Sequence, residues 1–112
     1  MGPSMRKQAA VTLAAGLLVT TVFGGRLERA FAALEVRDYF KARELFLKDA
    51  KHHPAAAWYG VSVITGRADN PFYQLDSSYA AILRSDSAFA RTSEKRRAAI
   101  AKLGVDAAAI VA

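Results

Sequence analysis

The sequence predicts an all-α fold built from antiparallel helical hairpins. Apolar residues recur at spacings of three and four from residue 26 onward, which is the pattern of helices with one buried face. Capping residues, glycines and prolines divide this pattern into helices of about 10 to 18 residues, and the short breaks between them favour antiparallel neighbours. No stretch alternates apolar and polar residues for long enough to form a strand.

Length and composition fit one small domain or a short repeat array. The chain has 112 residues, of which 53% are hydrophobic, and this composition excludes a disordered protein. Much of the apolar content is alanine, which buries little area, so we expect a thin helical core of modest stability. The absence of cysteine excludes disulfides, thiolate metal sites and a cysteine nucleophile.

The charge distribution gives no reason to expect nucleic acid as a partner. The formal net charge is +6, but Arg6 and Lys7 precede the predicted helical domain. Residues 26–112 carry 14 basic and 10 acidic side chains, and these are scattered along the chain. A nucleic-acid-binding domain is expected to gather its basic residues into a patch or stripe.

Residues 1–25 are predicted to be a signal peptide. Two basic residues follow Met5, an uncharged stretch covers residues 9–23, and two glycines come next. A basic start, an apolar middle and a small-residue end are typical of a secretory signal peptide. Cleavage is expected after Gly24, and the end of the "AFA" segment, Ala32, is the alternative site.

A retained membrane anchor is the alternative interpretation of this leader. The uncharged run from Gln8 to Gly25 has 18 residues, the lower limit for spanning a bilayer. An internal buried helix is disfavoured, because the stretch is terminal, follows basic residues and has no polar face. We therefore expect an exported protein of the periplasm or cell envelope, attached to the membrane only through residues 5–25 if the leader is retained.

The helical domain, residues 26–112, is expected to begin with a short amphipathic helix. Its apolar stripe comprises Leu27, Ala30, Phe31 and Leu34. A break follows at residues 36–38, where Asp38 stands in the N-cap position of the next helix.

The second helix, residues 39–50, has an unusually wide apolar arc. The arc comprises Tyr39, Ala42, Leu45, Phe46 and Ala50, extended by Phe40 and Leu47. Such an arc exceeds what one neighbour requires, so the helix is expected to pack between two others and to act as scaffold rather than as a binding surface. Asp49 intrudes on the arc, and its carboxylate is expected to reach a donor or the domain edge. Pro54 ends the helix.

Three further helical patterns follow. Residues 55–66 have almost no polar face, which predicts a buried central helix in which Ala57 and Gly60 admit a close backbone and Gly66 is the C′ residue. A turn at residues 69–71 precedes a helix whose apolar residues are Leu75, Tyr79, Ile82, Leu83 and Phe89. A last short helix starts at Thr92 or Ser93 and ends at Gly104.

The second helix also resembles a unit of a known repeat family. Tyr39, Ala42, Phe46 and Pro54 stand at offsets of 0, 3, 7 and 15, and this spacing resembles the second helix of a tetratricopeptide repeat. The following "AWYG" is similar to the start of the next unit, whereas Asp49 departs from the small residue usual there. The resemblance implies that the hairpins stack as a short α-solenoid.

The leader and the segments "RDYFKARELF" and "NPFYQLDSSYAAI" together resemble the beginning of longer exported repeat proteins of bacteria. This resemblance implies that residues 26–112 are an incomplete repeat domain, followed by further repeats in the whole protein.

No residue pattern predicts catalysis, a cofactor or a metal site. His52 and His53 are adjacent and point about 100° apart on a helix, so they cannot share a metal as an i, i+4 pair does. We interpret them as a polar last turn that suits the helix dipole. Three aspartates fit no calcium-binding loop; Asp69 is expected to cap a helix, and Asp76 and Asp86 to lie on the surface.

Two sets of side chains could contact a ligand but have simpler explanations. The basic residues around "EKRR" are expected to form a solvated helix face. Four aromatic residues could line a ligand groove, although core packing is the preferred interpretation. These aromatic residues are Trp58, Tyr59, Phe72 and Tyr73.

We therefore expect a scaffold module that binds a protein or peptide partner and is not an enzyme. The concave face formed by the first helix of each pair is the expected binding surface. Its candidate residues are Arg29, Tyr59, Ser62 and Arg67. The alternative is a structural subunit that associates with itself through an open C-terminal face, where Ile100 and Leu103 would be exposed.

Overall fold

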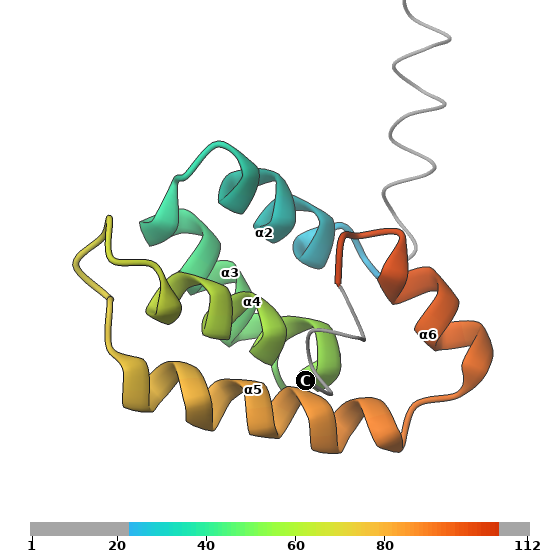
Figure 1. Cartoon of the computed structure of the whole chain (residues 1–112). Helices are drawn as coiled ribbons and strands as arrows, with labels where there is room; N and C mark the ends of the chain where they lie inside the picture. Colours follow the sequence, from blue (N-terminus) through green and yellow to red (C-terminus); the bar gives the residue numbers. More distant parts are fainter. Residues whose placement is uncertain (1–22, 106–112) are drawn as a thin grey trace, which may run out of the picture.

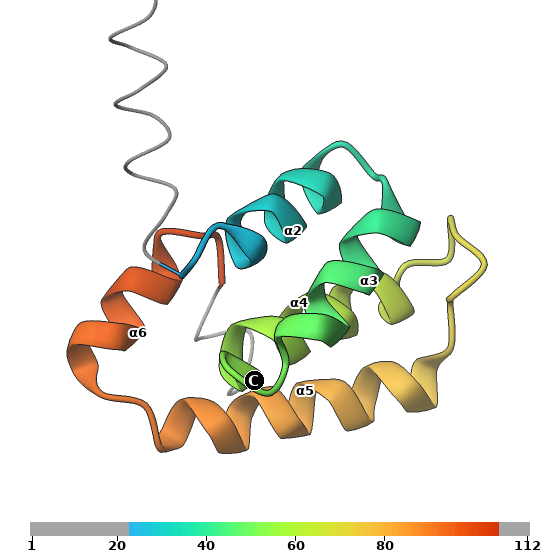
Figure 2. The ribbon, with the colours of Figure 1, turned by 180° about the vertical axis from the view of Figure 1, so that it is seen from behind.

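The computed structural model describes residues 23–105, and that part of the chain forms five α-helices and no strand. The helices are α2 (Arg26–Glu35), α3 (Tyr39–Asp49), α4 (Pro54–Gly66), α5 (Leu75–Ala90) and α6 (Glu94–Ala101). Successive helices from α2 to α5 reverse direction, and α6 turns back toward the start of α2 (Figures 1 and 2). The all-α prediction is confirmed. Most of the predicted leader, residues 1–22, and the chain end, residues 106–112, lie outside the described residues.

Helix α2 packs against α3 through a stripe of small and medium-sized apolar residues. Its buried side chains are Leu27, Ala30, Ala33 and Leu34. The helix ends in a turn in which Arg37 adopts a positive φ of 62°. Asp38 then caps α3 as predicted, because its carboxylate accepts a hydrogen bond from the Lys41 N–H at 3.3 Å.

Helix α3 packs between α2 and α4, as its wide arc predicts. Phe46 is fully buried and meets the Phe31 ring of α2 edge to face, with ring centroids 4.9 Å apart. The prediction that the whole arc is internal is wrong at its outer edge. Phe40 is 67% exposed and Leu47 is 38% exposed, because neither α2 nor α4 reaches that side of the helix.

The contact between α3 and α4 depends on Gly60. The Phe46 ring lies directly against the Gly60 backbone, and any Cβ there would overlap the ring. The prediction of a close approach at Gly60 is therefore correct in position, but the neighbour is an aromatic side chain rather than another backbone.

Helices α4 and α5 meet through small residues. The α4 side is rich in alanine, and α5 contributes Ala81, Ser85 and Ala88 as its buried residues. The Ser85 hydroxyl donates to the Ala55 carbonyl, and the Ser78 hydroxyl donates to the Ser62 carbonyl at 2.8 Å. The small side chains let the helices approach, and the hydroxyl groups tie one backbone to the other helix.

The larger apolar residues of α5 lie on the opposite side of the helix. Leu75, Tyr79 and Leu83 are 62%, 67% and 50% exposed, respectively. Helical spacing predicted the helix correctly, but this stripe of large residues does not face the core.

The turn between α4 and α5 is held by Asn70. Its side-chain amide donates to the carbonyls of Ile64 and Arg67, both at 2.9 Å, and its carbonyl oxygen accepts from the Phe72 N–H. The predicted capping role of Asp69 is wrong, because α5 begins only at Leu75 with Gln74 as its N-cap. Gly66 is the last residue of α4 rather than its C′ residue.

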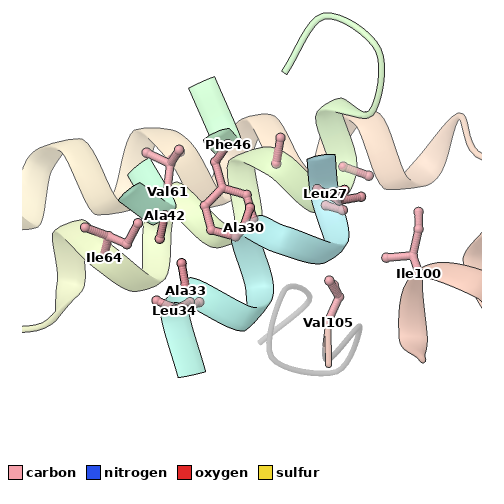
Figure 3. Packing of buried hydrophobic residues seen from close by; sticks show 14 of the residues in the cluster. Leu27, Ala30, Ala33, Leu34, Ala42, Phe46, Val61, Ile64, Ile100 and Val105 are labelled. Atoms are coloured by element: carbon pink, nitrogen blue, oxygen red, sulfur yellow. The ribbon is translucent and has the colours of Figure 1, made fainter. Parts of the chain in front are cut away.

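Helix α6 begins at the predicted cap, Ser93, whose hydroxyl accepts from the Arg96 N–H. Beyond the helix, Gly104 adopts a positive φ of 101°. Ile100 is only 3% exposed and belongs, with Val105, to the hydrophobic cluster that contains Leu27 (Figure 3). The prediction of an open face at Ile100 is therefore wrong, because α6 folds back onto the core.

The start of the described chain is part of the same core. Phe23 is buried, although the sequence assigns it to the leader. Its ring meets the His53 ring edge to face at 5.1 Å, and the Arg96 guanidinium lies 5.4 Å from its centroid. Its N–H donates to Glu28 Oε2 at 3.0 Å.

Candidate binding groove

A groove of about 520 Å³ opens above α4, between α3 on one side and α5 on the other. We call it the Trp58 groove. It is lined by Arg43, Leu47, Trp58, Val61, Thr65, Pro71, Phe72, Tyr73, Gln74, Ser77, Ala80, Ala81 and Arg84.

Helical periodicity brings these residues together. Trp58, Val61 and Thr65 stand at i, i+3 and i+7 on α4, so they share one face and form the floor. Residues 77, 81 and 84 repeat the same kind of spacing on α5. The turn held by Asn70 closes one end with its aromatic residues.

Two arginines on opposite walls lie over aromatic rings of the groove. The Arg43 guanidinium carbon is 4.7 Å from the centroid of the Phe72 ring. The Arg84 guanidinium carbon is 4.7 Å from the centroid of the Trp58 ring. Within residues 23–105 neither guanidinium group forms an ion pair or a hydrogen bond, and no carboxylate lines the groove. Cation–π contact therefore holds the two cations, and their side-chain N–H donors have no acceptor among the described residues.

The uncharged polar residues of the groove are largely paired with one another or with backbone. The Thr65 hydroxyl donates to the Val61 carbonyl at 2.8 Å, and the Ser77 hydroxyl donates to Gln74 Oε1 at 2.8 Å. Ser77 occupies the side-chain oxygen of Gln74, so the NH2 group of the Gln74 side chain remains as a further donor in the groove. The lining thus presents mainly donors and aromatic surface.

An apolar margin extends the groove along α3. Phe40 meets Phe72 edge to face, with ring centroids 5.0 Å apart, and Leu47 lies on the same side of the helix. Tyr73 is also exposed. The outer edge of the α3 arc, which the sequence assigns to the interior, is therefore part of an open apolar surface.

The four residues predicted for a concave face are not brought together at this groove. Arg29 is exposed on α2, and Tyr59 is half-buried on α4. Ser62 is 6% exposed, and its hydroxyl donates to the Tyr59 carbonyl at 2.6 Å. Arg67 is exposed beside the loop before α3, where its Nη1 donates to the Tyr39 hydroxyl at 3.4 Å.

Sequence reasoning missed Arg43 and Arg84. Arg43 interrupts the edge of the α3 arc between Phe40 and Leu47, and a cation at that position is the signal that could have identified an open edge. Of the four aromatic residues considered for a ligand groove, Trp58, Phe72 and Tyr73 line it, and Tyr59 does not.

Outside the Trp58 groove, Asp49 forms a polar cluster with His53 and Arg26. It is 3% exposed, with Oδ2 2.6 Å from His53 Nδ1 and Oδ1 3.8 Å from Arg26 Nη1. The prediction that this carboxylate reaches a donor is confirmed. The cluster ties the end of α3 to the start of α2 and to the residue before α4, which makes it a structural element.

The basic segment of α6 also has a structural contact. Arg97 donates from Nε to the Phe89 carbonyl and from Nη2 to the Ala90 carbonyl, both at 3.1 Å. These carbonyls belong to the last turn of α5, where a cation is favoured by the helix dipole. Arg97 is therefore a C-terminal cap and not only a solvated charge.

Comparison of the chain with protein-family models, curated protein sequences and solved structures finds no match. The tetratricopeptide resemblance thus rests on the residue pattern and remains a prediction. Among the helices of residues 23–105, none combines the length and apolar character that crossing a membrane requires. In the same part of the chain, no three histidine, cysteine or carboxylate side chains gather where they could hold a metal ion.

Proposed function

We propose that this protein is an interaction or assembly module exported to the bacterial cell envelope. The observation that carries the proposal is the outward stripe of α5, in which Leu75, Tyr79 and Leu83 are each at least half exposed. Contiguous large apolar residues on a surface mark sites where another molecule docks, because their hydration is unfavourable. The export part of the proposal rests on the leader pattern of residues 1–25.

The proposal assigns binding rather than catalysis to the Trp58 groove. None of the residues that line it is a carboxylate, a histidine or a cysteine, the side chains that most often act as general bases or nucleophiles. Arginine donors and aromatic faces are the groups that recognise a partner.

We further propose that the hairpins α2–α3 and α4–α5 are two units of a short tetratricopeptide-like α-solenoid. Support comes from α3, which packs on its own hairpin partner and on the first helix of the next hairpin. In a stacked array the second helix of the last unit lacks a following neighbour, and α5 holds that position with its large residues outward.

Site-directed photo-crosslinking tests the interaction function. The full-length protein carries a photo-reactive phenylalanine analogue at Tyr79 or Leu83, with exposed Lys41 on α3 as the control position. Irradiation of cells that produce the protein is expected to give discrete protein adducts at positions 79 and 83. Adducts no more abundant than those at position 41 would contradict the proposal.

Self-association is the second candidate, and the geometry of the α5 stripe favours it. Leu75, Tyr79 and Leu83 recur every fourth residue, so the stripes of two copies can pack side by side around a two-fold axis. Sedimentation of the full chain over a range of concentrations is expected to show a dimer that Tyr79→Glu converts to a monomer. Both proteins retain the leader, so any association through residues 1–25 is common to both. Identical sedimentation of the two would exclude this candidate.

A further inference from the structure

We propose that the Trp58 groove binds an acidic peptide segment of a partner protein, one that carries carboxylate side chains next to apolar ones. This inference rests on the proposed interaction function and adds the place and the chemistry of the contact. It concerns a surface distinct from the α5 stripe, because Leu75, Tyr79 and Leu83 do not line the groove.

Charge complementarity identifies the partner as acidic. The only charged residues that line the groove are Arg43 and Arg84, on opposite walls, and neither has an acidic partner within the described residues. The residue that follows Arg43 on α3 is the exposed carboxylate Glu44, and it pairs with Lys48 at 2.9 Å instead. A ligand with carboxylates would therefore meet two unpaired cations and no repelling charge.

The contacts with Phe72 and Trp58 orient the two arginines to bind carboxylates. A guanidinium group held over a ring keeps its N–H donors available at its edge, and these donors match a carboxylate in a two-pronged geometry. Because Phe72 and Trp58 restrict the two side chains, less conformational entropy is lost when a ligand binds. Lysine would offer neither the planar stacking nor the paired donors.

The rest of the lining identifies the partner as partly apolar. Val61 and Ala81 form a buried floor, the half-buried Trp58 ring and Leu47 offer apolar surface beside the arginines, and Phe40 and Tyr73 extend it at the margin. A volume of about 520 Å³ lies within the usual range of ligand clefts, roughly 300–1,000 Å³, and admits a few side chains of a short segment.

A single-stranded nucleic acid is the competing ligand, because it also offers anions and stacking groups. Its backbone carries one phosphate per nucleotide, and proteins that bind it follow that backbone with a track of cations. The groove supplies two cations, which suits a segment with a few carboxylates better than a continuous chain of phosphates.

The experiment uses the full-length protein immobilised on a support and two mixtures of seven-residue peptides. One mixture is drawn from Asp, Glu, Leu, Phe and Gly, and the matched mixture has Lys and Arg in place of the acidic residues. Enrichment of peptides from the acidic mixture alone is expected. The most enriched peptide is then titrated while the fluorescence of Trp58, the only tryptophan of the chain, is followed.

Substitution of the arginines locates the binding site. Arg43→Gln and Arg84→Gln are each expected to weaken binding of the selected peptide about tenfold, as befits the loss of a charge-assisted hydrogen bond. Arg29→Gln removes an exposed arginine on α2 outside the groove and is expected to leave the affinity unchanged. Circular-dichroism melting curves establish that all three variants fold.

Three results would overturn the inference. These are equal retention of the basic and acidic mixtures, undiminished peptide binding by folded Arg43→Gln and Arg84→Gln variants, and tighter binding of a single-stranded oligothymidylate than of the selected peptide. If the crosslinks at Tyr79 persist in such a case, the groove assignment alone has failed. If the crosslinks are absent and the peptide binds, the docking role proposed for the α5 stripe is wrong and the groove assignment stands.

Discussion

Gly60 shows how a single hydrogen atom sets the distance between two helices. With no side chain at this position, the Phe46 ring lies against the α4 backbone and fills the space between α3 and α4. Gly→Ala within a helix usually adds stability, because glycine has the greater conformational freedom in the unfolded chain. Here the overlap with an aromatic ring outweighs that gain.

We therefore expect Gly60→Ala to lower the free energy of unfolding by about 1–3 kcal/mol, the cost of overpacking a core. Urea denaturation followed by circular dichroism measures the change. Phe46→Leu in the Gly60→Ala background removes part of the ring and is expected to recover part of the loss. If the two substitutions are additive, the contact between them is not the cause.

Asp49 carries the second prediction at the residue scale. Its buried carboxylate contacts His53 and Arg26, so Asp49→Ala leaves two polar groups without their partner and is expected to cost about 1–3 kcal/mol. The matched control is Glu44→Ala, which breaks the exposed pair with Lys48 and is expected to change stability by at most about 0.5 kcal/mol. Equal effects of the two substitutions, measured by urea denaturation, would refute the structural role of Asp49.

At the scale of the element, α5 has an inverted amphipathic character. Its small residues, Ala81, Ser85 and Ala88, face α4, while larger apolar residues face solvent. Close packing and hydrogen bonding explain this arrangement. Small residues permit close approach to the alanine-rich face of α4, and serine hydroxyls bond to α4 carbonyls that a larger side chain would keep at a distance.

This character predicts an unusual pattern of tolerance. Ser85→Val replaces the hydroxyl with a methyl group and adds volume, so it is expected to cost about 1–3 kcal/mol through overpacking against α4 and loss of the hydrogen bond to the Ala55 carbonyl. Leu83→Gln changes a large apolar residue, yet it is expected to stay within about 0.5 kcal/mol because the side chain is half exposed. Thermal denaturation of both variants decides the point, and a larger effect at residue 83 would contradict the orientation of α5.

At the scale of the whole molecule, α6 closes the end of the domain. Ile100 and Val105 join the cluster around Leu27, and Arg97 bonds to the last carbonyls of α5. The last helix in the described chain is therefore bound on two sides. Most of the exposed large apolar residues lie on α5 and on the edge of α3, and the others are Val36 and Tyr73 in the turns.

Ile100→Asp is accordingly expected to release α6 from the core instead of blocking a dimer. Burial of an unpaired carboxylate is costly, and local undocking avoids it. Backbone amides of residues 94–101 are expected to exchange with solvent at least about tenfold faster in this variant. Ala98→Asp places the same charge on the exposed side of α6 and is expected to leave exchange unchanged. Unaltered exchange in Ile100→Asp would disprove the docking of α6.

The features that sequence predicted well are those with local causes. Asp38 and Ser93 cap helices through their own neighbouring backbone, and Asn70 holds its turn through groups within six residues. Helical spacing likewise predicts where α5 runs. Helical spacing does not show whether α5 packs against α4 through its large apolar residues or through its small ones. That depends on how closely the two helices can approach.

The groove could not be predicted for a related reason. Arg43 and Arg84 are far apart in the sequence and face one another only because α3 and α5 flank the same face of α4. The candidates Arg29, Tyr59, Ser62 and Arg67 follow from assigning the concave face to the first helix of each pair. The actual packing buries Ser62 under α5 and leaves the others outside the groove.

If the chain is exported as proposed, the packing of Phe23 bears on the order of cleavage and folding. A peptidase that cuts after Gly24 would remove a side chain that the folded domain holds against His53 and Arg96. Under the proposed export, proteolysis and folding would compete for the same short segment. A chain cut early would fold without one of its anchoring residues, whereas a chain that folds first would keep the bond beside Gly24 within a tight turn and retain its leader for longer.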